Sequence, residues 1–184
     1  MAATSITTVD VTGKFTLNKT MSGDIGKILA VQGVGWAKRK AATVGTITMS
    51  MKHFKDDSGV ENLHVHSTVV GGITVGKEER VLDGVERPTD DPLVGPIVNC
   101  MKRVAVADLT VPFLKDGFTA DTVENGVIHF SINSQPSNKY SWKLSQTCGL
   151  QDINGERRYV HHLKITSPTE DHEVLLVYDY LGPV

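Results

Sequence analysis

Turn-forming residues recur along this chain and divide it into short segments. They cluster at intervals of about 8–15 residues, for example at Gly71-Gly72, Asp83-Gly84, Asn125-Gly126 and Asn154-Gly155. The segments between them are rich in β-branched and aromatic residues, which favour strands. Parallel strands joined by helices would need longer connections than this spacing allows. The pattern therefore predicts an all-β protein whose antiparallel strands are joined by hairpins.

Nine strands are predicted, and they follow one another almost without interruption. They lie at residues 12–19, 44–54, 61–70, 73–82, 97–106, 127–134, 139–147, 157–166 and 173–181. A single up-and-down barrel of about nine to ten strands fits this order, because closure removes the exposed edges of an open sheet. A two-sheet sandwich is the alternative. The Pro- and Asp-rich stretch 85–96 is predicted to be an extended loop over one barrel end.

Helices are expected in only two places. Apolar residues between positions 21 and 41 have nearly helical spacing, which predicts a short helical lid near residues 21–41. A further helical turn is expected near residues 108–114. A length of 184 residues is typical of one domain, so residues 1–184 are expected to form a single barrel domain.

The charge and composition of the chain argue against several classes of protein. A net charge of −2 without any basic tract gives no electrostatic basis for binding nucleic acid. The longest apolar runs are too short to span a bilayer, and the first residues do not read as a signal peptide. Cys100 and Cys148 lie far apart, as free thiols in a reducing compartment do. We therefore expect a cytoplasmic protein with no integral membrane segment.

One stretch near the N-terminus carries a more specific signal. Gly13-Lys14-Phe15 opens a predicted strand, a helical stretch follows, and Gly33-Val34-Gly35-Trp36 precedes a basic segment. This order resembles the opening of the intracellular fatty-acid-binding proteins, which with the lipocalins belong to the calycin superfamily. In that family the Gly-Val-Gly-aromatic step leads into the second strand. The resemblance implies a calycin-like barrel whose function lies in an internal cavity.

The resemblance also implies how a ligand is held, and the chain departs from the family there. The family binds a carboxylate with an Arg-x-Tyr pair on the last strand. If Tyr178 takes the tyrosine position, Leu176 stands where the arginine is expected. Arg157 or Arg158 on the preceding strand is an alternative source of the charge. A neutral, polycyclic or aromatic molecule fits this altered end as well as a fatty acid does.

Three histidines are candidates for catalysis inside such a cavity. His64 and His66 lie two residues apart in a predicted strand, so their side chains share one face, which either meets solvent or lines the cavity. His161 lies on the more apolar face of its strand, which is expected to point inward. Histidine can act as an acid or a base near neutral pH. No spacing supplies a third metal ligand, so neither a metal nor a cofactor is expected.

Apolar and aromatic side chains that alternate along the predicted strands are expected to form the cavity wall. They can pack against a hydrophobic molecule, and a tyrosine hydroxyl can also donate a hydrogen bond to it. The candidate ligand-binding residues are Trp36, Met49, Met51, Tyr140, Trp142, Tyr159, Tyr178 and Tyr180.

Two functions fit these features. The first, which the lack of a catalytic motif favours, is binding of a hydrophobic small molecule inside the barrel. The second is a cofactor-independent isomerase, dehydratase or cyclase that acts on a polyketide- or terpene-like intermediate in the same cavity. There, shape would restrict the conformers while histidine or tyrosine moves protons. The histidine-rich strands and the lost carboxylate clamp favour this second function.

Overall fold

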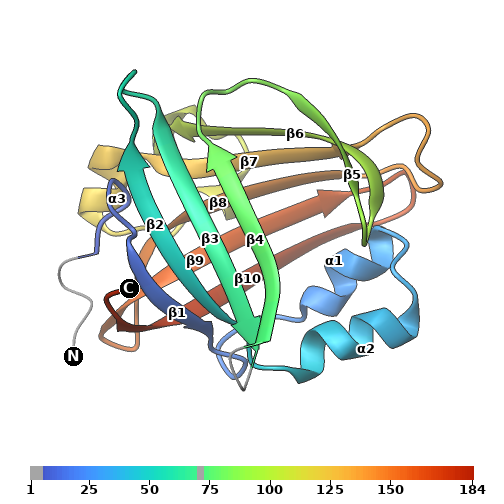
Figure 1. Cartoon of the computed structure of the whole chain (residues 1–184), viewed down its shortest axis with the longest axis horizontal. Helices are drawn as coiled ribbons and strands as arrows, with labels where there is room; N and C mark the ends of the chain where they lie inside the picture. The colour runs from blue at the N-terminus through green and yellow to red at the C-terminus, as the bar shows by residue number, and fades with distance from the viewer. Residues whose placement is uncertain (1–5, 70–72) are drawn as a thin grey trace.

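A single sheet of ten antiparallel strands curls around the interior of the molecule (Figure 1). The computed structural model describes residues 6–69 and 73–184, so the predicted turn at Gly71-Gly72 lies outside the described residues. The strands are β1 (Gly13–Leu17), β2 (Thr48–Lys55), β3 (Glu61–Val69), β4 (Ile73–Val81), β5 (Arg87–Asp91), β6 (Gly95–Val104), β7 (Val127–Ser134), β8 (Lys143–Ile153), β9 (Glu156–Thr166) and β10 (Asp171–Gly182). Their order in the sheet is β4-β3-β2-β1-β10-β9-β8-β7-β6-β5. The predicted up-and-down, calycin-like architecture is confirmed, and one continuous sheet takes the place of a sandwich.

Helices cover one end and one outer face of this sheet. α1 (Ile25–Val31) and α2 (Trp36–Val44) follow β1 and lie together at the lower right of Figure 1, which confirms the predicted helical lid. Three further pieces lie between β6 and β7, namely the 3-10 turns η1 (Val106–Asp108) and η2 (Pro112–Leu114) and the helix α3 (Ala120–Asn125). The turns confirm the helical turn expected near residues 108–114, whereas α3 was not predicted.

The segment that contains these turns packs on the outer faces of β8 and β9. Thr147 on β8 donates a hydrogen bond of 2.6 Å to the carbonyl of Leu114. Gly149 leaves the space that the ring of Phe118 fills, because a β-carbon there would collide with that ring. His162 on β9 stacks beneath Phe113 and Phe118, with ring centroids 5.1 and 4.9 Å away. The outward faces of these two strands are therefore buried, although the sheet has its main core on the other side.

The junction between α1 and α2 differs from the sequence prediction. Asp24 caps α1 by accepting a hydrogen bond from the Gly26 N–H at 2.8 Å. After α1, Gly33 has a φ of +81°, which a residue with a β-carbon rarely adopts, and the Tyr140 ring occupies the space beside it. Trp36 then begins α2 rather than a strand. The expected step from this glycine motif into the second strand is therefore wrong.

The stretch 85–96 contains a strand where only a loop was expected. β5 forms a hairpin with β6, in which Pro88 lies opposite Val98. A proline has no N–H to donate, so within a sheet it is found mainly on edge strands, at the start of a strand or at a bulge. β5 is such an edge strand, because it ends the strand order. The prediction of an extended loop is therefore wrong for residues 87–91.

The barrel is open between its two edge strands, β4 and β5. These strands occupy the opposite ends of the strand order. The sheet edges approach each other just after β4, where Asp83 forms an isolated bridge with Lys102 of β6. From there they diverge toward α1 and α2, as Figure 1 shows. The molecule is thus a curled half-barrel with a gap along one side.

Candidate ligand-binding and catalytic site

A cluster of polar side chains lies inside the barrel on three neighbouring strands. In the register of the sheet, His161 of β9 lies opposite Cys148 of β8 and Leu176 of β10. The His161 ring is 4.6 Å from the Tyr178 ring and 5.0 Å from the Tyr159 ring, measured between centroids. All of these residues are buried. The interior wall of β8, β9 and β10 therefore combines apolar packing with several hydrogen-bonding groups.

These groups are uncharged near neutral pH. Burial raises the pKa of the Cys148 thiol to about 11 and raises the pKa values of Tyr159 and Tyr178 above the usual range. Burial also lowers the pKa of His161 to about 3, with smaller contributions from the positive charges of Arg80 and His162. A histidine with so low a pKa remains neutral and takes up a proton poorly. The cluster can therefore donate and accept hydrogen bonds but is poorly suited to acid–base catalysis.

The guanidinium of Arg80, on β4, faces this cluster. The sheet register places Arg80 opposite Leu63, which belongs to the core. Its guanidinium carbon lies 5.1 Å from the ring centre of Phe130 on β7, and it donates to one carboxylate oxygen of Glu78 from Nε at 2.9 Å and from Nη2 at 2.7 Å. Its positive charge affects the pKa of His161, Tyr159, Tyr178 and Cys148. Arg80 is thus a cation of the barrel interior.

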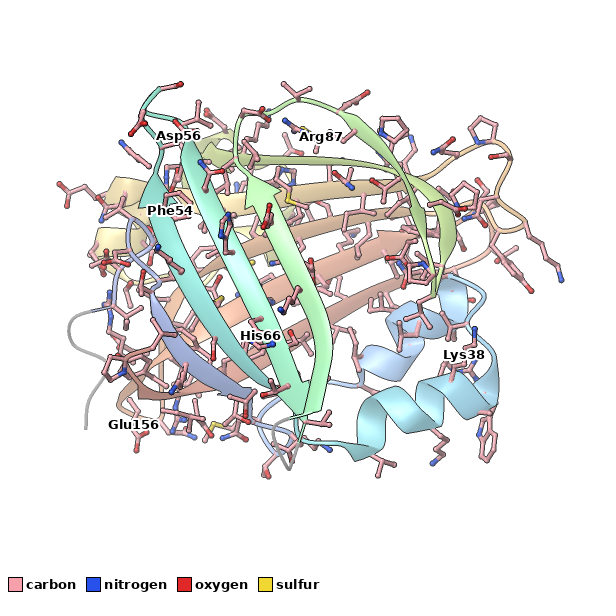
Figure 2. The ribbon with its side chains drawn as sticks, in the orientation of Figure 1. Lys38, Phe54, Asp56, His66, Arg87 and Glu156 are labelled. Carbon is pink, nitrogen blue, oxygen red and sulfur yellow. The ribbon has the colours of Figure 1, made fainter. Side chains whose placement is uncertain are left out.

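A cleft of about 380 Å³ leads into the barrel at the gap beside β4. Figure 2 shows Arg87 at the edge of this gap. Met101 of β6, which lines the cleft, lies opposite Phe130 of β7, whose ring contacts the Arg80 guanidinium. Its wall includes Glu78, Arg80, Ile97, Asn99, Met101 and Ile132. A hydrophobic molecule that entered here would pass directly beside the Arg80 guanidinium.

A second cavity of about 280 Å³ lies at the helical end of the barrel. It is bounded by β1 and by the start of α1, and its lining includes Leu17, Ser22, Ile25 and Ile47. Ser22 is tied to β10, because its hydroxyl accepts a hydrogen bond of 2.9 Å from the Val177 N–H. The helical lid is therefore anchored to the sheet beside this cavity.

Most of the sequence-predicted residues come together in the interior. Phe15 packs between Tyr159 and Tyr180, with ring centroids 5.2 and 5.3 Å away. The predicted residues that belong to the core or pack against it are Met49, Met51, Trp142, Tyr159, Tyr178 and Tyr180. His161 joins them on the inward face of β9, as described above.

Four other predicted residues do not reach the interior. Trp36 on α2 is 67% exposed, and Tyr140, which precedes β8, is 41% exposed. His64 and His66 lie on the face of β3 that carries neither Leu63 nor Val65, so they point away from the core. Figure 2 shows His66 on this outer side of the sheet.

The interior charge does not come from the residues that sequence reasoning considered. Arg157 donates to Asp121 and to the carbonyl of Ile6, and Arg158 pairs with Glu156 and Asp179 on the outer side of the sheet. Arg80 and Glu78 were missed, because the run Lys77 to Arg80 has the composition of an exposed strand. The signal that could have found them is Leu82, a buried residue with the same strand parity as Arg80.

Two further observations concern metals and membranes. Within residues 6–69 and 73–184, no group of three or more His, Cys, Asp or Glu side chains is arranged to hold a metal ion. Among the helices of the described residues, none has the length and apolar character needed to cross a membrane.

Comparison with known proteins gives matches to two curated relatives. The chain is 27% identical over 182 residues to a probable pericyclase, scpY, of Mollisia scopiformis, and the match covers 97% of this chain and 94% of that protein. It is also 27% identical over 163 residues to the pericyclase pydY of an Acremonium species, covering 85% and 84% of the two chains. No protein-family model matches the chain.

Solved structures show where the fold belongs. The REP1-NXSQ fatty acid transporter superposes with a TM-score of 0.54 at 15% identity, covering 95% of this chain and 98% of that one. A Schistosoma mansoni fatty acid binding protein in complex with arachidonic acid superposes with a TM-score of 0.53 at 11% identity, covering 93% and 96%. The chain has the calycin-type fold of the fatty-acid-binding proteins. The resemblance seen in the sequence is thereby confirmed for the fold.

Proposed function

We propose that this protein is a cofactor-independent cyclase of the pericyclase type, which closes a ring within a hydrophobic intermediate held in the barrel. The observation that carries this proposal is the uncharged polar cluster around His161. Acid–base catalysis requires a group that changes its protonation state near the working pH. The buried tyrosines, Cys148 and His161 all keep theirs.

A pericyclic reaction suits such an interior because it needs no proton transfer. Its new σ bonds form together from existing π bonds within one molecule, so the product is an isomer of the substrate and no atom is gained or lost. Catalysis then depends on holding the reacting ends of a flexible chain close together. The buried aromatic residues Phe15, Phe130 and Trp142 belong to one core cluster and provide rigid surfaces for this purpose.

The two pericyclase relatives support this function, because their similarity extends over most of the chain. We extend the proposal to a polyketide- or terpene-like substrate, a cytoplasmic location and a single domain that needs no nucleic-acid partner. Of the three candidate histidines we assign only His161 to the site, where it shapes the wall and forms hydrogen bonds rather than acting as an acid or a base, since His64 and His66 lie on the outer face.

Simple binding and transport of a hydrophobic molecule is the second candidate. The fold shared with a fatty acid transporter favours it. The two functions differ in what happens to the bound molecule, because a carrier returns it unchanged, whereas a pericyclase returns an isomer.

The test is to incubate the full chain with linear polyenes that contain a conjugated diene and a separate alkene, and to follow them by liquid chromatography and mass spectrometry. We expect a product of unchanged mass with a new retention time, formed faster than without protein. His161→Phe should slow its formation about tenfold by altering the shape and hydrogen bonding of the wall. His66→Phe makes the same change on the outer face and should leave the rate unaltered. Polyenes that bind but are recovered unchanged would establish the carrier instead.

A further inference from the structure

The Arg80 side chain is held in place inside the barrel by its neighbours. The Arg80 side chain points inward, because Arg80 lies opposite the core residue Leu63 in the sheet. The ring of Phe130 supports the guanidinium from the opposite wall, and the side chain is only 19% exposed. A guanidinium that is already oriented loses little freedom when it forms further hydrogen bonds.

Most of the hydrogen-bonding capacity of Arg80 is unused. A guanidinium has five N–H groups, and those of Arg80 make two hydrogen bonds, both to the same oxygen of Glu78. Its Nη1 has no acceptor within the described residues 6–69 and 73–184. The Glu78 side chain is 52% exposed at the cleft, so it orients the guanidinium without enclosing it. Arg80 therefore presents free donors to whatever enters the cleft.

Two further polar groups of the interior also lack hydrogen-bond partners. In the described part of the chain, neither the Tyr178 hydroxyl nor Nε2 of His161 makes a hydrogen bond to the protein. These residues are only 8% and 7% exposed, yet neither atom is among the fully buried unpaired atoms of the described residues, so both border accessible space. A polar atom that borders such space in the interior can form a hydrogen bond with a molecule that enters it. Tyr178 and His161 therefore offer hydrogen bonds on the wall that Arg80 faces.

We propose that the Arg80 guanidinium, oriented by Glu78, binds a carbonyl or carboxylate oxygen of the hydrophobic guest, with Tyr178 and His161 as further hydrogen-bonding groups. The substrate class is then an apolar unsaturated chain that carries a carbonyl group, rather than a pure hydrocarbon. This rests on the proposed function where catalysis is concerned: a hydrogen bond to a carbonyl conjugated with a reacting alkene withdraws electron density from it and stabilises the transition state of ring closure.

Binding of three matched probes tests this assignment. They are a conjugated tetraene fatty acid, its methyl ester and the corresponding tetraene hydrocarbon, whose fluorescence reports their binding to the full chain. We expect the acid and the ester to bind at least about tenfold more tightly than the hydrocarbon, because a hydrogen bond from a charged group is a strong one. Arg80→Met should abolish this preference and retain binding of the hydrocarbon, which also shows that the variant is folded.

The matched control is Lys77→Met, which removes one positive charge from the outer face of the same strand and should retain the full preference. An unmodified chain with no preference for the oxygen-bearing probes, or an Arg80→Met variant that keeps that preference, would overturn the assignment. Its failure is distinguishable from that of the proposed function. If Arg80→Met loses the preference but the unmodified chain converts no polyene, the binding site is supported and the cyclase function is refuted. If the unmodified chain converts a polyene but Arg80→Met keeps the preference, the cyclase function is supported and the role of Arg80 is refuted.

Discussion

Two arginines face the interior of this barrel, and their surroundings are opposite. Arg103 at the end of β6 donates five hydrogen bonds, to both carboxylate oxygens of Glu61 and to the carbonyls of Thr8, Asn125 and Gly126. Arg80 on β4 donates two, both to one oxygen of Glu78. A guanidinium has five donors. The first arginine is therefore saturated by the protein, and the second is not.

The carboxylates differ in the same way. Glu61 also accepts a hydrogen bond of 2.6 Å from Nε2 of His53, whose Nδ1 in turn accepts one from the Val11 N–H. The Glu61 side chain is 14% exposed, compared with 52% for Glu78. Glu61 thus joins β2, β3, β6 and the N-terminal segment. One arginine–carboxylate pair, Arg103 with Glu61, thus stabilises the fold, whereas the more exposed pair of Arg80 with Glu78 leaves its guanidinium available for a ligand.

The same substitution at the two carboxylates should have unequal effects on stability. Glu61→Gln leaves Arg103 and His53 without their charged acceptor, so we expect the free energy of unfolding to fall by about 2–4 kcal/mol. Glu78→Gln affects a more exposed pair and should change it by less than about 0.5 kcal/mol. Urea denaturation of both variants measures the difference. Equal losses would show that the two pairs play the same structural role.

The contribution of Glu61 to stability should also depend on pH. Burial alone would raise its pKa, but hydrogen bonds from His53 and Arg103 outweigh this effect and lower it from 4.5 to about 2. A carboxyl group whose pKa is lower in the folded state stabilises the fold above its unfolded pKa and loses that contribution as the pH falls. The stability difference between the unmodified chain and Glu61→Gln should therefore shrink between about pH 5 and pH 2. Urea titrations at several pH values would reveal a constant difference if this account is mistaken.

Arg80 and Arg103 should also differ in their effect on the His161 side chain, although this effect is the smallest of those expected. After burial, the charge of Arg80 is the next cause of the lowered pKa of His161. Arg80→Met should raise that pKa but leave it below 6.5, because burial persists. Arg103→Met should not change the pKa of His161, because Arg103 is paired with Glu61 and is not among the charges that affect His161. Ring chemical shifts of His161, followed by NMR across a pH series, measure both variants, and an identical shift in both would contradict the separation.

Much of the fold could be predicted from the sequence, because strands and turns have local signals. The hairpin spacing, the helical lid and the inward face of β9 with Tyr159 and His161 all follow from residue type and alternation. Strand β5 was missed because Pro88 argues against a strand unless the edge position is known. Tyr140 was placed in a strand because it alternates with Trp142, yet β8 begins only at Lys143.

The charged part of the site could not be predicted in this way. Whether Glu78 and Arg80 face inward depends on the register of β4 against β3, which shifts at a bulge between Ser67 and Thr68. A shift of one residue turns every side chain of a strand to the opposite face. The local sequence also does not determine that His64 and His66 lie on the outer face of β3. Which face of a strand points inward can be assigned only when its pairing with the neighbouring strands is known.

The gap beside β4 has a further consequence for how copies of this chain meet. Two unpaired strand edges offer backbone groups with which another chain could pair and so begin an aggregate. β5 interrupts one edge with Pro88 and carries the negative charges of Asp90 and Asp91, while Lys77 and Glu79 place both signs of charge on β4. Charged residues and prolines at such edges discourage pairing between molecules. The proline that made β5 hard to recognise and the charges on both edge strands therefore keep the molecule open without inviting polymerisation.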